Sequence, residues 1–190
     1  TVEAALESVG VQSRAAKNLL PSLLVPVGKS KVMKALRERV QQYARHDGAV
    51  LLSGEPGTGR GAFARYMHAL SRRTNEPLTN ITAASLTDSN VKEQLFGYEA
   101  DGEVVAGALE RAAGGTLVID ELLDLGATAQ KILLGVIESG QFTRVGGSTP
   151  VKMNARIVAT ASADYEGAID SGNLRRDLVA GLSVLNLRVP

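Results

Sequence analysis

The sequence predicts an α/β fold in which helices cover both faces of a mostly parallel five-stranded sheet. Continuous apolar runs, typical of strands buried on both faces, alternate along the chain with segments whose apolar residues recur at helical spacing. A glycine-rich turn joins the first apolar run to a helix, and two carboxylates follow another run. Alternation of this kind favours parallel strands joined by crossover helices.

The strands and helices follow from local patterns. The first helix is expected after Ser30, a frequent helix N-cap, and its apolar residues recur at helical spacing: Val32, Met33, Leu36, Val40 and Tyr43. Strands are predicted at 49–52, 78–82, 116–120, 155–161 and 184–189. Longer helices are predicted at 62–68, 108–113, 129–137, roughly 164–171 and roughly 174–181. We also expect a short helix capped by Asp88 or Ser89, a loop over 99–107, and a hairpin of 141–145 with 151–153.

Composition limits the classes of function. The 190 residues fit one domain, and 21 Lys and Arg against 20 Asp and Glu give no electrostatic argument for nucleic-acid or membrane binding by this segment. The absence of cysteine excludes disulfides and thiolate metal sites and fits a reducing cytoplasm. No apolar run is long enough to span a bilayer, so we expect a cytoplasmic protein. We assign residues 1–26 to a linker from an upstream module and 27–190 to the core.

The glycine-rich turn is nearly a phosphate-binding loop. It reads Gly54-Glu55-Pro56-Gly57-Thr58-Gly59-Arg60-Gly61, and the whole stretch is a candidate phosphate site. Arg60 stands at the usual lysine position, and its planar guanidinium donates hydrogen bonds in a different geometry from the compact ammonium of lysine. Gly61 stands at the usual hydroxyl position and offers no ligand to Mg²⁺. We expect phosphate binding to survive these changes and fast hydrolysis to be lost. The alternative is a tight turn without a ligand.

Asp120 and Glu121 follow the apolar strand at 116–120, about 60 residues beyond the loop, where open α/β sheets place ligands. This is the arrangement of a Walker B motif. Asp120 would hold Mg²⁺, directly or through water, and Glu121 would orient or deprotonate the attacking water. The alternative is a pair of solvated carboxylates at the end of a strand.

These motifs resemble the AAA+ central domain of NtrC-group transcription activators, which remodel sigma-54 RNA polymerase. Further matching segments occur in order along the chain: Glu93–Glu99, Gly114–Glu121, Arg144–Gly147, Arg156–Ala159 and Arg175–Leu178. The resemblance implies a three-layer P-loop NTPase sandwich, with a C-terminal helical lid that is absent from this chain. It also implies adenine near Val27 and Gly28, and Arg175 as a catalytic arginine finger.

The departures from the family pattern bear on function. The G-A-F-T-G-A loop that contacts sigma-54 belongs between Glu99 and Gly107, where this chain is shorter and lacks the motif, as in NtrX-like relatives. A sigma-54 contact is therefore not expected. The sensor I pair falls on Ala161 and Ser162, the second arginine finger on Gly181, and the asparagine that couples Walker B to the loop on Thr82.

Three functions remain open. The favoured one is a divergent regulatory domain of a bacterial transcriptional regulator in a two-component system, which binds ATP or ADP weakly or hydrolyses ATP slowly, with Mg²⁺ if nucleotide binds. Its expected partners are further copies of itself in a dimer or ring, DNA through a domain outside this chain, and RNA polymerase as a candidate. The alternatives are a scaffold that binds no nucleotide and an active ATPase that uses Arg60 in place of lysine.

Overall fold

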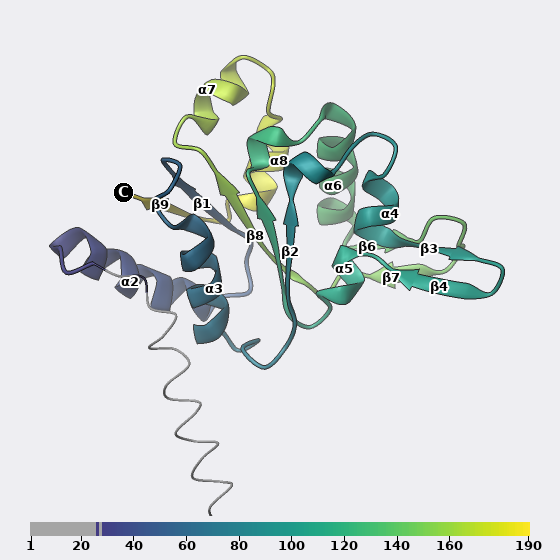
Figure 1. Ribbon diagram of the computed structural model, residues 1–190, viewed down its shortest axis with the longest axis horizontal. Helices are drawn as coiled ribbons and strands as arrows, with labels where there is room; N and C mark the ends of the chain where they lie inside the picture. The colour runs from purple at the N-terminus through teal and green to yellow at the C-terminus, as the bar shows by residue number, and fades with distance from the viewer. Residues whose placement is uncertain (1–25, 27) are drawn as a thin grey trace, which may run out of the picture.

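The computed structural model describes residue 26 and residues 28–190 (Figure 1). The linker predicted for 1–26 therefore lies almost entirely outside the described residues. The central sheet has five strands in the order β2-β5-β8-β1-β9, and every neighbouring pair is parallel. The strands are β1 (Val50–Gly54), β2 (Leu78–Thr82), β5 (Thr116–Asp120), β8 (Arg156–Ala161) and β9 (Leu185–Val189). The predicted sheet is thus confirmed.

Alternate residues of the central strands enter two separate cores. Leu51, Leu117 and Ile157 belong to one hydrophobic cluster, whereas Val50 and Val118 belong to the other. Successive side chains of a strand point to opposite faces, so a strand covered on both faces must be apolar throughout. This explains the continuous apolar runs of the sequence.

Helices cover the two faces and complete three layers (Figure 1). One cluster contains residues of α2 (Lys31–Ala44) and α3 (Arg60–Leu70). The other contains residues of the remaining helices and turns: α4 (Val91–Phe96), α5 (Ala108–Arg111), η1 (Ala83–Ser85), η2 (Leu122–Asp124), α6 (Ala127–Ser139) and α8 (Arg176–Leu182). The short helix α7 (Tyr165–Asp170) has no buried residue.

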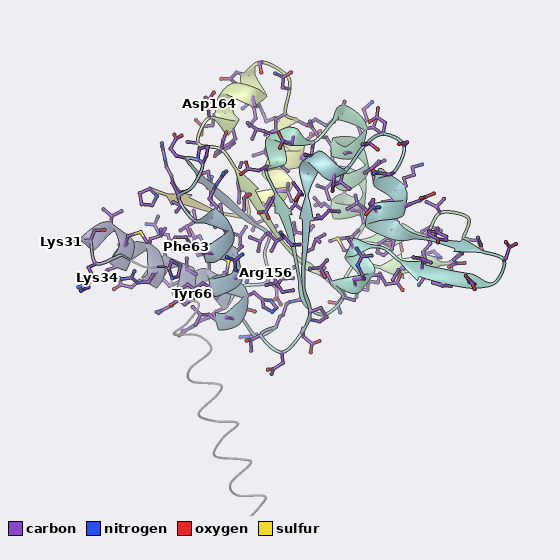
Figure 2. The ribbon with its side chains drawn as sticks, in the orientation of Figure 1. Lys31, Lys34, Phe63, Tyr66, Arg156 and Asp164 are labelled. Carbon is purple, nitrogen blue, oxygen red and sulfur yellow. The ribbon has the colours of Figure 1, made fainter. Side chains whose placement is uncertain are left out.

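Helix α2 begins as the sequence predicts. The Ser30 hydroxyl accepts a hydrogen bond from the Met33 N–H at 3.2 Å, which caps the helix. Val32 is 59% exposed, so its inclusion in the apolar face was wrong. It lies in the first turn beside Lys31 and Lys34, at the end of α2 that extends away from the sheet (Figure 2).

Two local predictions between β2 and α5 were also wrong. Helix α4 follows Asn90, and its N-terminus has no side-chain cap, so neither Asp88 nor Ser89 caps it. The expected loop over 99–107 instead contains an antiparallel hairpin of β3 (Gly97–Ala100) and β4 (Glu103–Ala106), which extends away from the central sheet (Figure 1). Positive φ angles at Asp101 and Gly102 form the tight turn that joins these strands.

Arg144 ties the β3–β4 hairpin to the body. Its guanidinium donates to Glu99 of β3 at 2.6 Å and to both carboxylate oxygens of Glu110 in α5, at 2.5 and 2.8 Å. The hydrogen bond from Arg144 holds the pKa of Glu110 below its ordinary value. Arg144 lies between β6 (Gln141–Thr143) and β7 (Pro150–Lys152), the hairpin that the sequence predicts, with shorter strands.

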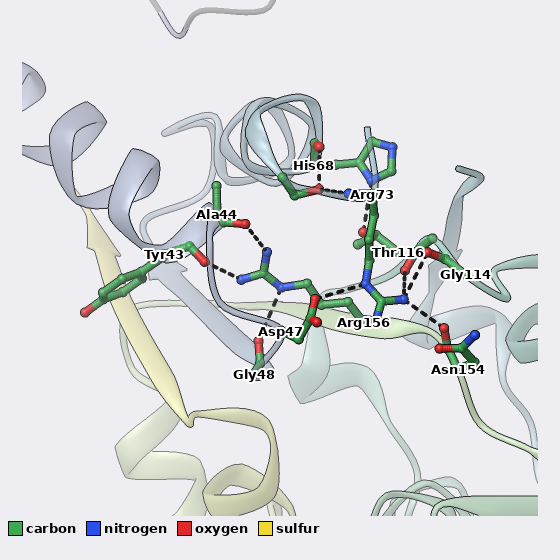
Figure 3. A network of polar contacts seen from close by, with 12 residues as sticks. Tyr43, Ala44, Asp47, Gly48, His68, Arg73, Gly114, Thr116, Asn154 and Arg156 are labelled. Carbon is green, nitrogen blue, oxygen red and sulfur yellow. Dashed lines mark hydrogen bonds and ion pairs between the residues drawn. The ribbon is translucent and has the colours of Figure 1, made fainter. Parts of the chain in front are cut away.

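A buried arginine joins α2 to the amino end of β8 (Figure 3). Arg156 is 2% exposed and donates to the carbonyl oxygens of Tyr43, Ala44 and Gly48 at 2.7, 3.4 and 3.3 Å. Burial lowers the pKa of Arg156. Because Gly48 precedes β1, this contact fixes the path of the chain from α2 into the sheet.

Candidate functional site

The glycine-rich turn connects the carboxyl end of β1 to α3. Gly57 and Gly59 both have φ of 85°, in the left-handed region that side chains disfavour. The Thr58 N–H and hydroxyl both donate to the Glu55 carbonyl, at 3.3 and 2.9 Å, and close the turn. Glu55 and Pro56 are exposed beside it. The predicted loop is therefore a turn whose backbone requires glycine at two positions.

Apart from that of Thr58, the backbone N–H groups from Gly57 into the first turn of α3 have no acceptor among the described residues. The first backbone hydrogen bond of α3 runs from Phe63 N–H to the Gly59 carbonyl at 3.0 Å. Within the described residues, the N–H groups of Gly57 and of 59–62 donate to no protein acceptor. Unpaired N–H groups at the start of a helix attract anions, so this backbone fits phosphate groups.

Strand β9 closes one side of the loop. A Cβ atom at Gly54 would lie 2.5 Å from the Val189 carbonyl oxygen and 2.9 Å from the Thr58 hydroxyl. Only glycine fits between these atoms without a shift of the backbone. Gly54 thus lets the edge strand and the loop approach each other closely.

Arg60 and Glu121 form an ion pair across the site. The Arg60 guanidinium donates to both carboxylate oxygens of Glu121, at 2.5 and 3.3 Å. The Arg60 side chain is only 7% exposed, whereas the Glu121 side chain is 43% exposed. Glu121 has a φ of 59°, an uncommon backbone conformation for a residue with a side chain. The structure therefore joins the residue at the lysine position to the predicted catalytic carboxylate.

Asp120 is held by two residues that sequence reasoning missed. Its Oδ2 accepts from the Asn80 amide at 2.8 Å, and its Oδ1 accepts from the Thr160 hydroxyl at 3.2 Å. The Thr160 hydroxyl also accepts from the Glu121 N–H at 3.0 Å. The sequence signal for Thr160 was a hydroxyl side chain inside the otherwise apolar run of β8, and the structure buries that side chain. The family's coupling asparagine aligns with Thr82, and the asparagine that contacts Asp120 is Asn80, two residues earlier in β2.

The donor set suits a divalent cation poorly. Each of the four carboxylate oxygens of Asp120 and Glu121 already accepts a hydrogen bond, and Gly61 contributes no side-chain oxygen. Magnesium prefers oxygen ligands and would have to share these atoms beside a guanidinium. In the described part of the chain, no group of three or more His, Cys, Asp or Glu residues could hold a metal ion. The assignment of Asp120 to Mg²⁺ stays a prediction.

The two remaining predicted residues lie at other places. Arg175 precedes α8, and its guanidinium donates to both oxygens of Asp177 at 3.0 and 2.6 Å, which lowers the pKa of that carboxyl. No hydrogen bond among the described residues joins Arg175 to Asp120 or Glu121. The Gly28 carbonyl accepts from Arg37 of α2 at 2.9 Å.

Comparison with known proteins identifies the family. The sequence pattern of the Sigma-54 interaction domain matches residues 26–188. The chain is 38% identical over 169 residues to the DNA-binding transcriptional regulator NtrC of a Bradyrhizobium strain, and 36% identical to the transcriptional regulatory protein FlbD of Caulobacter vibrioides. Each match covers 86% of this chain but only 35% and 37% of those relatives.

Solved structures agree with this result. NtrX from Brucella abortus in complex with ADP superimposes with a TM-score of 0.83 at 35% identity, covering 100% of this chain and 43% of that chain. The same protein in complex with ATP gives a TM-score of 0.81 at 35% identity and covers 41% of that chain. Over residues 26 and 28–190, no helix is both long and apolar enough to cross a membrane. On these grounds the chain belongs to the Sigma-54 interaction domain family and has the P-loop fold of its NtrC-type regulators.

Proposed function

We propose that this chain is the nucleotide-responsive domain of a bacterial transcriptional regulator, which binds ATP or ADP weakly, hydrolyses ATP slowly at most, and self-associates. The observation that carries the proposal is the row of unpaired N–H groups at Gly57 and 59–62 beside the Arg60–Glu121 pair. The nucleotide complexes of the similar NtrX support it.

The residues of the chain have separate roles in this proposal. The backbone of Gly54–Gly61 would hold the phosphates, with Gly28 near the base. Asp120 would hold Mg²⁺ only if the ion replaced its hydrogen bonds from Asn80 and Thr160, and Glu121 would orient water for hydrolysis. Bound ATP supplies the phosphate bond to be cleaved. Because Arg60 engages both oxygens of Glu121, that carboxylate must leave the ion pair before it can orient water. We therefore expect slow turnover.

The family also suggests the role of the whole regulator, which is part of the proposal. Residues 27–190 form the core that follows a linker at 1–26, in a cytoplasmic regulator of a two-component system that reaches DNA through a domain outside this chain. RNA polymerase remains a candidate partner. The two-residue turn of the β3–β4 hairpin supports the expectation that sigma-54 contact is lost.

Calorimetric titration with ADP and with ATP, each in the presence of Mg²⁺, tests nucleotide binding. Gly57→Ala should weaken it by roughly 5- to 30-fold, because φ is 85° there and a side chain in the left-handed region costs about 1–2 kcal/mol, which drives the loop out of its binding conformation. Gly172→Ala is the matched control, since Gly172 has a φ of 79°, equally open surroundings and a position outside the loop. Absence of binding in the unaltered protein, or binding that Gly57→Ala leaves intact, would contradict the proposal.

Steady-state phosphate release across protein concentrations tests hydrolysis. The rate per subunit should stay well below about 1 s⁻¹, near the lower limit of ordinary enzymes. If Arg175 acts on a neighbouring copy, the rate should rise as subunits assemble, and Arg175→Ala should remove that rise. Turnover in the ordinary range at every concentration would favour the active ATPase that uses Arg60.

A scaffold that binds no nucleotide is the second candidate. The Arg60–Glu121 pair favours it, because the cation of the loop is already neutralised by the protein. Calorimetry separates the candidates, since a scaffold gives no binding heat with either nucleotide.

A further inference from the structure

Among the described residues, Arg60 carries the one guanidinium that pairs with a carboxylate in the polar cluster at the carboxyl ends of β1 and β5. The exposed Arg65 lies nearby, 3.7 Å from the position of a Cβ atom at Gly61. The Arg60 side chain is only 7% exposed and donates to both oxygens of Glu121. The groups that hold the neighbouring Asp120 are a neutral amide, from Asn80, and a neutral hydroxyl, from Thr160. The cluster therefore holds two carboxylates and one guanidinium.

The two parts of a phosphate loop serve different phosphates. Backbone N–H groups of the loop cradle the inner phosphates, and the cation at the lysine position reaches the β- and γ-phosphates. Among the residues that the structure describes, the N–H groups at Gly57 and 59–62 have no acceptor, whereas the cation at Arg60 already pairs with Glu121. The backbone N–H groups can hold the α- and β-phosphates without help from the cation, but a γ-phosphate lies beyond those groups and must compete with Glu121 for Arg60.

This competition has an electrostatic cost. A γ-phosphate adds negative charge on the side of the site where Asp120 and Glu121 already lie. If Arg60 turns to the phosphate, Glu121 loses its counter-ion. If Arg60 stays, the γ-phosphate has no buried counter-ion among the described residues, only the exposed Arg65 near Gly61. Like charges a few ångströms apart near a protein surface shift a binding constant by roughly tenfold or more.

We propose that Glu121 is a specificity-determining residue that makes this site prefer a nucleoside diphosphate to a triphosphate. The proposal rests on the proposed function, because it requires that the loop binds nucleotide. It assigns to Glu121 a role opposite to that of a catalytic base, since the carboxylate then disfavours the substrate of hydrolysis. The domain would respond to ADP more than to ATP.

Titration of ADP and of ATP in EDTA, where no metal neutralises the phosphates, tests the proposal. ATP should bind the unaltered protein about tenfold more weakly than ADP. Glu121→Gln keeps the shape but removes the charge, so ATP should bind about tenfold more tightly while the ADP affinity changes less than about twofold. Glu103→Gln is the control, because Glu103 is an exposed carboxylate of β4, outside the phosphate loop, and forms no ion pair with Arg60.

The outcomes separate this proposal from the proposed function. Equal binding of ADP and ATP by the unaltered protein, or a ratio that Glu121→Gln leaves unchanged, overturns the proposal and leaves nucleotide binding intact. Absence of binding by either nucleotide overturns both. The unaltered protein provides a second test. The difference between its affinities for ADP and for ATP should become smaller as the salt concentration rises, because salt screens the repulsion between the γ-phosphate and the carboxylates. A difference that is independent of salt indicates steric exclusion and also overturns the proposal.

Discussion

Replacement of Arg156 should destabilise the protein through loss of its contacts with the end of α2. Arg156→Met removes the guanidinium while it keeps most of the apolar stem. The carbonyl oxygens of Ala44 and Gly48 then have no donor among the described residues, whereas that of Tyr43 keeps the hydrogen bond from the His46 N–H at 3.1 Å (Figure 3). A buried polar group left without a partner costs more than the hydrogen bond contributed.

The lengths of the three hydrogen bonds indicate how much stability Arg156→Met should remove. The bond to Tyr43 at 2.7 Å is short and charge-assisted and should contribute about 1.5–3 kcal/mol, whereas the bonds at 3.3 and 3.4 Å are long and contribute less. Burial of the charge, which lowers the pKa of Arg156, offsets part of the gain. We expect a net loss of about 2–4 kcal/mol in the free energy of unfolding.

Urea unfolding followed by circular dichroism measures this loss. With an m-value of about 2 kcal/mol per molar urea, the midpoint should fall by about 1–2 M. Arg72→Met is the matched control, because Arg72 is exposed, and its effect should stay within about 0.5 kcal/mol. If Arg156→Met costs no more than Arg72→Met, the buried guanidinium does not stabilise the junction of α2 and β1, and the reasoning is refuted.

Three further predictions concern the loop and the buried histidine. Arg60→Lys replaces two donors to Glu121 by one ammonium, so nucleotide affinity or phosphate release should rise; no change in either would exclude Arg60 as the limiting defect. Gly54→Ala places a Cβ 2.5 Å from the Val189 carbonyl oxygen and should cost about 1–3 kcal/mol in thermal unfolding, whereas an unchanged midpoint would contradict this close approach. Burial lowers the pKa of His68, so the unfolded state binds a proton first and stability should fall as pH drops below about 6.5, and less so in His68→Gln. Urea unfolding at several pH values measures how the free energy of unfolding depends on pH. An equal dependence in His68→Gln would show that His68 does not cause it.

Local sequence patterns were sufficient for most of the fold. The central strands are continuous apolar runs because helices cover both faces, and their alternate residues enter separate cores. The β3–β4 hairpin escaped prediction because it is short and half-exposed, with Tyr98, Val104 and Val105 at the surface, so it lacks the alternation of a buried strand. The Asp101-Gly102 pair, a frequent hairpin turn, was its one local signal.

The sequence by itself determined the phosphate loop, the strand-end carboxylates and the order of the elements, since each depends on residues that are neighbours along the chain. The tertiary structure alone decided which side chains of the site meet. Arg60 and Glu121 are 61 residues apart, and β8 lies between β1 and β5, so a long arginine side chain is needed to bridge strands roughly 9–10 Å apart. Asn80 and Thr160 reach Asp120 only because β2 and β8 flank β5. Motifs therefore specify the parts of the site, and strand order specifies their contacts.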